Sequence, residues 1–593
     1  MDDTQANRAL KAPILSHVQE LYSFAKYRKT PFERLSASSP VQAVVSAILF
    51  VVHGLKSIIW DVVLSPSTYL SDPLQSLAIL VVYPLGGTVI FLLSLVFALG
   101  RIGGYGDSLI DYVSDRRAKG YSIVNWANPD IFTQLAPSVD EAQPYLDGSK
   151  PTTDYQDWPL DPTAPGRESA LVRTIPLPLV RAFLAFNALV YERKDQLVVQ
   201  AKEVVATAYE AFGGTSDAFY EQLENAAQIL VLSESRIAAE VALYGLRFEG
   251  VSDLNSVAGS FAGLFFSKPG SLKPFIVLAF KGTGPTAFAE WLTDCTLDRT
   301  SATSVLGGGG AHTGFFESLF RSPRRDYESN GYDTILRALK QVAKALKHGD
   351  KTKVQLWVTG HSLGGAYAEL AYMRLLASPA DLGPDLELRD CYTYGAPRPG
   401  DGQLASEYEK MSLTPLERPN SLWRIKNRLD VVTRVPLGIA DDEDRRDALT
   451  PLDVLNYAHL GPALRLHKPV KSSGQGRFSI EFLGRLKGAS HVQILDKGNV
   501  VVPWGAQVPT STSMSPHGSQ GSSSSSATVI VSDEGVNPVQ VAMKLFATLV
   551  PCVWNHFPAS YFDSLGNPHS VNTVSRSTVR PSVGEKSSSS RSA

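Results

Sequence analysis

The chain has 593 residues, of which 44% are hydrophobic and 19% are charged, as is ordinary for a globular protein. This length exceeds one compact core and predicts more than one structural unit. The net charge of −2 gives no electrostatic reason to expect a nucleic-acid partner.

The N-terminal part combines a polar segment with two apolar runs. Residues 1–40 are polar and mixed in charge, which is not typical of a secretory signal. Residues 77–100 carry no charge and as a helix would span about 36 Å, enough to cross a bilayer core, although Pro84 interrupts them. The shorter run at 41–55 is more typical of an interfacial segment. We therefore predict that residues 41–105 form hydrophobic, membrane-associated helices, with buried helices of a soluble domain as the alternative.

The charges around these runs predict the side on which the rest of the chain lies. Basic residues precede the first run and follow the second, while Lys56 is the only basic residue between them. By the positive-inside rule, a hairpin places both flanks in the cytosol, whereas a single span would place them on opposite sides. The lack of any Asn-x-Ser/Thr sequence also favours the cytosol. So do the three cysteines, which have neither metal-type nor disulfide-type spacing: Cys295, Cys391 and Cys552.

The next part changes from irregular to periodic. Residues 106–175 are rich in Pro, Asp and Thr, which predicts an irregular linker, and residues 179–211 have helical spacing. Short apolar runs separated by helical stretches follow. This alternation predicts an α/β fold with a mostly parallel central sheet covered by helices. The predicted strands are 275–280, 354–359, 390–394 and 422–426.

Two low-complexity stretches mark the C-terminal part of the chain. Residues 509–527 include an unbroken serine run and predict a disordered insert, and residues 571–593 predict a disordered tail. The segment 536–565 between them has the composition of ordered protein. We therefore predict one α/β domain over residues 176–567, interrupted by the insert.

The strongest local motif is Gly-His-Ser-Leu-Gly at residues 360–364. A β-type run precedes it and a helix-forming run follows, which is the context that a nucleophile elbow requires. This sharp turn forces Ser362 into a strained conformation and lifts its hydroxyl above the sheet. The N-terminus of the following helix then favours negative charge on a substrate oxygen. Ser362 is therefore the candidate nucleophile.

A serine nucleophile needs a base, and the base needs an acid that orients it. In this type of fold both follow the serine in the chain. Asp430 is the preferred acid because it lies just past an apolar strand, where ligands bind in such sheets, and Asp390 and Asp401 are the runners-up. For the base, local pattern leaves His459 and His556 open. The other histidines after the preferred acid are His467, His491, His517 and His569.

Seven short motifs follow one another along the second half of the chain: AFKGT at 279–283, EWLTD at 290–294, HTGF at 312–315, GHSLG at 360–364, YGAPR at 394–398, NRLD at 427–430 and YAHLG at 457–461. With these motifs in this order, the chain from about Pro274 to Leu565 resembles the class 3 lipases, the fungal-lipase-like α/β-hydrolases. The resemblance covers about half of the chain and leaves out the N-terminal hydrophobic region. It implies an α/β-hydrolase fold that needs neither a metal nor a cofactor.

The resemblance implies a catalytic triad on this chain. Ser362 matches the family's nucleophile and Asp430 its acid. The Tyr-x-His-x-Gly motif that holds His459 is structural in the family. The family's base comes last, shortly before an aromatic pair, and His556 ahead of 561–562 fits that place with a longer spacing than the family shows.

The resemblance also implies an oxyanion hole and a lid. One donor is the backbone N–H of Leu363, and the other belongs to Thr283, with Lys281 in place of the family's arginine. The family's lid corresponds to residues 284–310. Its apolar residues beside a glycine run favour a flap that opens onto lipid, with an ordinary helix and surface loop as the alternative.

Together these features predict an acylglycerol lipase type of enzyme, which hydrolyses lipid carboxylic esters through an acyl-enzyme on Ser362. The expected setting is a membrane or lipid-droplet surface, with a membrane-associated protein whose catalytic domain faces the cytosol. The alternatives are a phospholipase A1, a lipid acyltransferase with the same triad, and a catalytically silent membrane scaffold.

Overall fold

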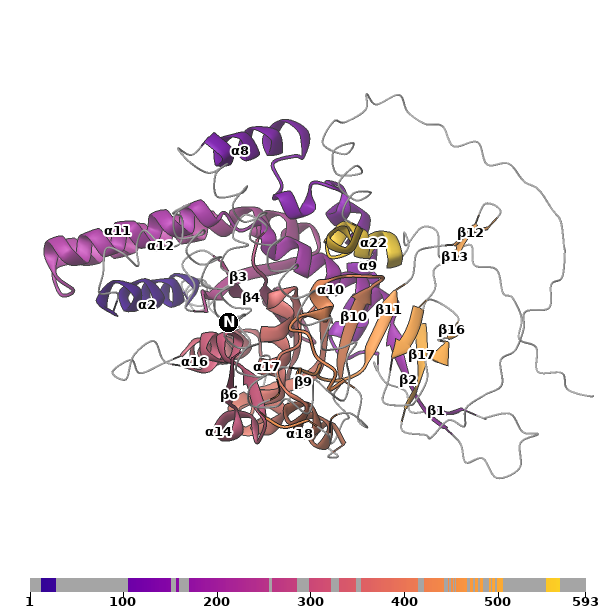
Figure 1. Ribbon diagram of the computed structural model, residues 1–593. Coiled ribbons are helices and arrows are strands. Elements are labelled where there is room, and N and C mark those ends of the chain that lie inside the picture. Colours follow the sequence, from indigo (N-terminus) through magenta and orange to yellow (C-terminus); the bar gives the residue numbers. More distant parts are fainter. Residues whose placement is uncertain are drawn as a thin grey trace, which may run out of the picture.

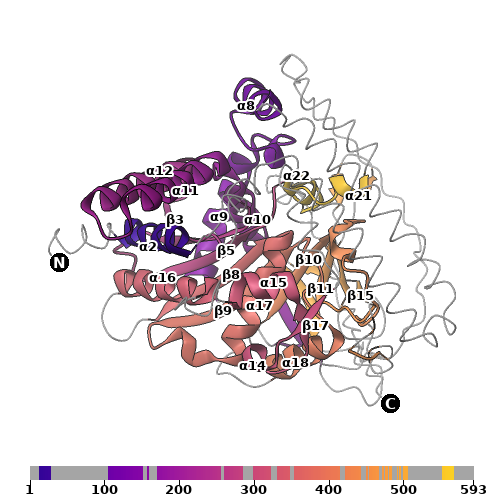
Figure 2. The same ribbon diagram turned by 60° about the vertical axis from the view of Figure 1, so that its left-hand side comes forward.

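A computed structural model gives the fold of this chain (Figures 1 and 2). The predicted hydrophobic region 41–105, apart from Tyr105, lies outside the residues that it describes, as do the insert 509–527 and the tail 571–593. No helix in the described part of the chain is long and apolar enough to cross a membrane. The described residues are 12–27, 105–150, 156–158, 170–254, 259–284, 298–321, 330–347, 353–413, 421–441, 446, 449–451, 453, 455–466, 470–472, 475–477, 480–483, 490–491, 493–495, 499–504 and 551–565.

The centre of the molecule is a sheet with nine strands in its described part (Figure 1). The five middle strands, from β5 to β11, are parallel, and the strands at both edges are antiparallel. The predicted α/β fold is confirmed, with a sheet that is mixed as a whole. The four predicted strands are β5, β8, β9 and β10. In spatial order the sheet contains β15 (Ser490–His491), β14 (Ile480–Leu483), β11 (Ala463–Leu466), β10 (Leu422–Asn427), β9 (Leu386–Tyr394), β8 (Val354–His361), β5 (Phe275–Lys281), β4 (Phe261–Ser267) and β3 (Leu246–Ser252).

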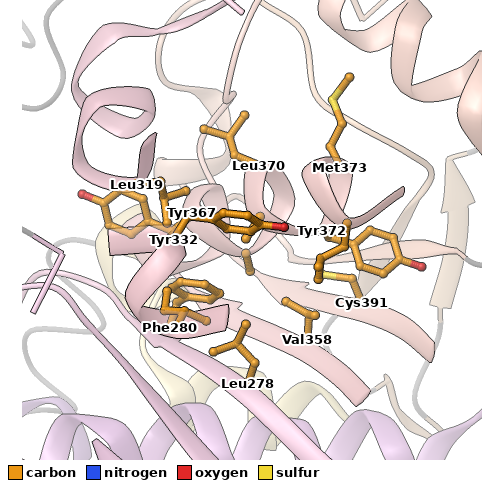
Figure 3. Packing of buried hydrophobic residues seen from close by; sticks show 14 of the residues in the cluster. Leu278, Phe280, Leu319, Tyr332, Val358, Tyr367, Leu370, Tyr372, Met373 and Cys391 are labelled. Carbon is orange, nitrogen blue, oxygen red and sulfur yellow. The ribbon is translucent and has the colours of Figure 1, made fainter. Parts of the chain in front are cut away.

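Both faces of the sheet are covered, which explains why every residue of the central strands β5 and β8 is buried. Side chains of β5 alternate between the faces, and Leu278 and Phe280 point into one of two cores. Figure 3 shows Tyr367 and Leu370 of α17 packed above them. The helices of this face include α15 (Thr313–Phe320), α16 (Gly331–Leu346) and α17 (Leu363–Ala377).

The opposite face corrects the prediction of an irregular linker at 106–175. Helix α9 lies within that range and packs with α10 against β5 residues such as Val277. Pro137 and Pro144 inside α9 disguise it in the sequence, because proline usually ends a helix. The core on this face includes residues of η3 (Ile123–Asn125), α9 (Ile131–Leu146), α10 (Leu177–Leu189) and α22 (Pro558–Leu565). The helix α8 (Tyr105–Arg117) precedes them in the chain.

The core shared by α9 and the sheet also moves the domain boundary. Apolar residues from Tyr121 to Leu146 belong to the same buried cluster as those of β5, β8 and β10. The domain therefore begins well before residue 176, the predicted start.

Three helices form an arm beside the sheet, and Figures 1 and 2 show them lying side by side. The N-terminal helix α2 packs its apolar side, including Leu21, against α11 and α12. The helical spacing over 179–211 corresponds to α10, a short turn η4, and α11. The bounds are α2 (Ala12–Tyr27), η4 (Val190–Glu192), α11 (Asp195–Phe212) and α12 (Asp217–Leu243).

A smaller antiparallel sheet joins segments far apart in the chain. Its strand β2, inside the range predicted as a linker, pairs with β17 just before the predicted insert. The strands of this sheet are β1 (Gln156–Trp158), β2 (Ala170–Pro176), β17 (Asn499–Trp504) and β16 (Gln493–Leu495). The remaining elements are β6 (Arg299–Ser301), α14 (Thr303–Leu306), β7 (Gly310–His312), η6 (Pro379–Leu382), α18 (Gly402–Leu413), η7 (Val432–Arg434), β12 (Val470–Ser472), β13 (Gln475–Arg477) and α21 (Pro551–Trp554).

Candidate active site

Ser362 lies at the turn between β8 and α17, at the carboxyl end of a central parallel strand. Its backbone has φ 59° and ψ −134°. Such a conformation costs a non-glycine residue about 1–3 kcal/mol. Two hydrogen bonds hold the turn: the Ser362 N–H donates to the Tyr394 carbonyl at 2.9 Å, and the Gly365 N–H donates to the Ser362 carbonyl at 2.8 Å. The strained turn that the Gly-x-Ser-x-Gly pattern predicts is therefore present.

Asp430 and His556 are far apart in the chain and in direct contact. The carboxylate oxygens Oδ1 and Oδ2 lie 3.1 and 3.0 Å from His556 Nδ1. The Tyr561 hydroxyl donates to Oδ2 at 2.7 Å, and the Val432 N–H donates to Oδ1 at 3.0 Å. Because a carboxylate only accepts hydrogen bonds, Nδ1 of His556 carries the proton and Nε2 is left to accept one.

The base candidate lies beside the nucleophile turn. The His556 ring stacks on the ring of His361, the residue before Ser362, with centroids 4.6 Å apart. Gly395 has φ 60°, and a Cβ atom there would lie 2.8 Å from His556 Nδ1, so only glycine fits this position. The hydrogen bonds of His556 in the described residues do not include one to the Ser362 hydroxyl. In substrate-free enzymes this contact is often long and tightens when substrate binds.

The predicted oxyanion residues lie on two sides of the serine. Leu363 is fully buried and begins α17, so its backbone N–H belongs to the helix N-terminus. Thr283 follows β5, the parallel neighbour of β8. A Cβ atom on Gly282 would lie only 2.9 Å from Ser362 Cβ, which brings this segment against the nucleophile. Lys281 forms an ion pair with an aspartate of α11.

The runner-up acids and the rival histidine hold backbone segments in place. The ring nitrogen Nε2 of His459 donates to the Thr433 carbonyl at 2.9 Å. The backbone N–H of His459 donates to the Asp441 carboxylate at 2.7 Å. Burial keeps the pKa of His459 well below its usual value. Asp390 accepts the backbone N–H of Ser421, just before β10, and Asp401 accepts those of Gly310 in β7 and Leu404 in α18. Of the remaining histidines after Asp430, His491 lies in β15. Three lie outside the described residues: His467, His517 and His569.

Three residues at the site have roles that the sequence motifs do not indicate. Tyr561 is the tyrosine of the aromatic pair, and its hydroxyl is a partner of the Asp430 carboxylate. Tyr191 of η4, which no local motif surrounds, lies with its hydroxyl 2.8 Å from His361 Nδ1. Burial, and then the neighbouring His556, keep the pKa of His361 well below its usual value, so this ring is neutral.

A further residue ties β10, which ends just before Asp430, to the segment that carries His556. Asn427 is the last residue of β10 and is fully buried. Its Nδ2 donates to the Asn555 carbonyl and to Ser560 Oγ, both at 2.9 Å. The first position of the motif at 427–430 therefore joins β10 to α22.

Only part of the predicted lid lies in the described residues. Residues 285–297 lie outside them, and residues 298–310 form β6, α14 and the start of β7. Arg299 anchors this part by donating to the carbonyls of Pro451, Asp453 and Asn456. The segment nearest the glycine run is therefore held by the domain.

The parts brought together here are those of nucleophilic acyl transfer. They are a hydroxyl on a strained turn, an imidazole oriented by a buried carboxylate, and backbone N–H groups at a helix N-terminus. In the described part of the chain, no group of three or more His, Cys, Asp or Glu side chains is arranged to hold a metal ion.

Comparison with known proteins decides the family. Residues 277–439 match the family model described as lipase (class 3). Residues 277–439 therefore form a class 3 lipase region of this chain. The matched residues include Ser362 and Asp430 and end before His556.

Curated relatives of this chain are distant. The triacylglycerol lipase OBL1 of Ricinus communis is 27% identical over 224 residues, which are 33% of this chain and 40% of that protein. The secreted mono- and diacylglycerol lipase 1 of Fusarium solani is 26% identical over 186 residues, 31% of this chain and 46% of that protein. The matches thus span less than half the length of these relatives. Among solved structures, the Lip2 lipase of Yarrowia lipolytica is 21% identical, with 41% of this chain and 72% of that chain covered and a TM-score of 0.28.

Proposed function

We propose that this class 3 lipase hydrolyses lipid carboxylic esters through an acyl-enzyme on Ser362. His556, oriented by Asp430, takes the hydroxyl proton while the serine oxygen attacks the ester carbonyl. The backbone N–H of Leu363 and a donor on Thr283 stabilise the oxyanion. His556 gives the proton to the leaving alcohol, and a water that His556 then deprotonates releases the fatty acid from the serine.

The observation that carries this proposal is the Asp430–His556 contact beside the strained serine turn. Backbone strain at Ser362 and a fully buried carboxylate both cost stability. A catalytically silent scaffold would need neither feature. A general-base pair next to a nucleophile needs both.

Active-site labelling tests the proposal. A fluorophosphonate reacts with a serine only where a base activates its hydroxyl. We expect the wild-type chain to be labelled and to hydrolyse emulsified esters, and Ser362→Ala to do neither while unfolding at the same temperature. Labelling and hydrolysis that persist in Ser362→Ala would overturn the nucleophile assignment.

We propose acylglycerols as the substrate class, which agrees with the lipases named among the relatives. A panel of triacylglycerol, diacylglycerol and phosphatidylcholine at equal interfacial concentration tests this choice. Faster release of fatty acid from an acylglycerol supports it. Faster release from phosphatidylcholine would reassign the enzyme as a phospholipase A1, and acyl transfer to an added lysophospholipid in preference to water would reassign it as an acyltransferase.

We also propose that residues 41–105 hold the enzyme at a membrane or lipid-droplet surface, with the catalytic domain on the cytosolic side. The support is in the sequence: residues 77–100 carry no charge, and basic residues flank the region on both sides. An enzyme held in this way meets an insoluble substrate in two dimensions.

A further inference from the structure

A chain of hydrogen bonds runs behind the proposed catalytic residues. The backbone N–H of Gly282 donates to the Tyr191 hydroxyl oxygen, and this hydroxyl lies 2.8 Å from His361 Nδ1. On the other side of the same ring, His361 Nε2 lies 2.8 Å from the carbonyl oxygen of His556. The chain therefore joins the end of β5, the residue before the nucleophile and the residue that carries the base.

The chemistry of the four groups fixes the direction of each bond. The His556 carbonyl can only accept, so His361 Nε2 carries the ring proton and Nδ1 is an acceptor. The Tyr191 hydroxyl must then donate to Nδ1, which leaves its oxygen to accept the Gly282 N–H. A single tautomer of a neutral His361 satisfies every group in the chain.

The surroundings keep these bonds in place. Tyr191 is 4% exposed and His361 is 2% exposed, so solvent offers neither of them a replacement partner. The Tyr191 ring also meets the His361 ring edge to face, with centroids 5.6 Å apart. Both side chains therefore have one well-defined position.

From this geometry we infer that Tyr191 and His361 are positioning residues, which set the place of the His556 imidazole relative to Ser362. The inference rests on the proposed function, in which His556 is the base.

The reason lies in how His556 is held. Asp430 fixes its ring at Nδ1, while His361 fixes its backbone through the carbonyl and stacks on its ring at an interplanar angle of 29°. His361 is also the chain neighbour of Ser362. The His361 side chain thus helps to set the separation of base and nucleophile, and Tyr191 in turn holds that side chain in its tautomer and orientation.

The variant Tyr191→Phe tests the inference because it removes one hydroxyl and keeps the ring. A displacement of about 1 Å between reacting groups costs up to about a hundredfold in rate. We expect kcat for ester hydrolysis, and the rate constant for fluorophosphonate labelling, to fall roughly tenfold to a hundredfold, with KM within about twofold of wild type. The matched control is Tyr244→Phe, which likewise removes one buried tyrosine hydroxyl. The Tyr244 hydroxyl donates to the Phe132 carbonyl at 2.8 Å instead of to His361.

A pair of variants at His361 separates positioning from packing. His361→Gln keeps a donor and an acceptor on one planar group, whereas His361→Leu removes both. We expect the glutamine variant to be labelled at least tenfold faster than the leucine variant. Equal rates in these two variants would overturn the inference.

The outcomes distinguish the inference from the function beneath it. If wild type is labelled and Ser362→Ala is not, the function stands, and a Tyr191→Phe rate equal to that of Tyr244→Phe overturns the positioning role alone. A wild-type chain that does not react overturns both. A kcat loss confined to Tyr191→Phe and His361→Leu, at unchanged KM, supports the inference.

Discussion

The Asp430 carboxylate shows how the site is built at the scale of single residues. It accepts hydrogen bonds from the His556 ring, the Tyr561 hydroxyl and the Val432 N–H, and it is fully buried. The bond to Nδ1 decides which ring nitrogen of the base is left to accept a proton. In the proposed mechanism, the function of His556 as the base therefore depends on the charge of Asp430 as well as on its position.

Asp430→Asn should be nearly inactive and still folded. The amide can donate to His556 Nδ1, which favours the tautomer that cannot take a proton from the serine, and this change costs about 10⁴ in kcat in triads of this kind. Initial rates of ester hydrolysis, read together with the unfolding temperature, check the prediction. A variant that keeps more than a tenth of wild-type kcat would show that Asp430 is not the orienting acid.

Gly395→Ala tests how closely the base is packed. A left-handed alanine costs about 1–2 kcal/mol, and its Cβ atom would also press on the His556 ring. We expect that loss of stability together with at least a tenfold loss of kcat.

The control for Gly395→Ala is Gly245→Ala. That glycine has φ 73° and nothing within 4 Å of the added atom. It should lose similar stability, measured by denaturant unfolding, and keep full activity. Equal kcat in the two alanine variants would contradict the packing described here.

The same scale separates what local sequence predicts from what it does not. The turn at Ser362 is specified by five adjacent residues and their flanking strand and helix, so the motif is sufficient to predict it. The contact of Tyr191 with His361 joins residues 170 positions apart. Only the packing of α10 and η4 against the sheet brings them together, and no local pattern encodes that packing.

At the scale of elements, a buried charge cluster attaches the helix α2 to the other two helices of the arm and to the end of β3. We use this name for His17, Glu20, Arg193, Lys202, Glu234 and Asp253. His17 Nε2 lies 3.6 Å from a Glu234 oxygen, and Glu20 accepts the Asp253 N–H at 2.6 Å. The cations pair with Asp253 at 2.5 Å. Helix α2 thus brings two titratable groups into the cluster.

The pKa values of these two groups shift in the direction that weakens α2 as pH rises. Burial disfavours the charged His17 ring, but the Glu234 carboxylate outweighs it and raises the His17 pKa above 6.5. Burial, and then Asp253, raise the pKa of Glu20 from 4.5 to about 7. Both groups bind protons more tightly in the folded state, so their contribution is complete at low pH and is lost as pH rises through the folded values.

We expect the hydrogen-exchange protection factors of the α2 amides, corrected for intrinsic rates, to fall roughly tenfold between pH 5 and pH 8. The amides of β8 serve as the reference. In Glu20→Gln, which cannot ionise, the loss between pH 5 and pH 7 should be smaller. Protection of α2 that does not vary with pH would show that the cluster does not control its docking.

Element prediction succeeded where one physical signal dominated. The strand β5 has an unbroken apolar run over residues 275–280, and both β5 and β8 are buried throughout because both faces of the sheet are covered. The sequence does not predict helix α9 because Pro137 and Pro144 interrupt its apolar stripe, although residues such as Ile131 and Leu135 are fully buried. The antiparallel strands β3 and β4 are absent from the strands that the sequence predicts.

At the scale of the whole molecule, the site lies entirely in the part of the chain after residue 190. The helices on either side of the hydrophobic region, α2 and α8, are both within the described residues. Removing residues 41–100 should therefore leave the domain, and both helices, intact.

We expect the variant lacking residues 41–100 to leave the membrane fraction and to keep its fluorophosphonate labelling. The physical reason is the loss of the charge-free run at 77–100. Sedimentation of cell membranes, followed by labelling of pellet and supernatant, measures both properties. The variant lacking 509–527 is the control and should stay with the membranes. A labelled variant without 41–100 that still sediments with membranes would rule out this region as the anchor.

The acyl-enzyme on Ser362 is the central claim, and acid-quenched mass spectrometry tests it most directly. After mixing with a p-nitrophenyl ester for about one turnover, the peptide that contains Ser362 should gain the mass of the acyl group. Asp430→Asn should show much less of this adduct, and Ser362→Ala none. An enzyme that hydrolyses the ester with no acyl group on any residue, or with the group on a different residue, would contradict the account.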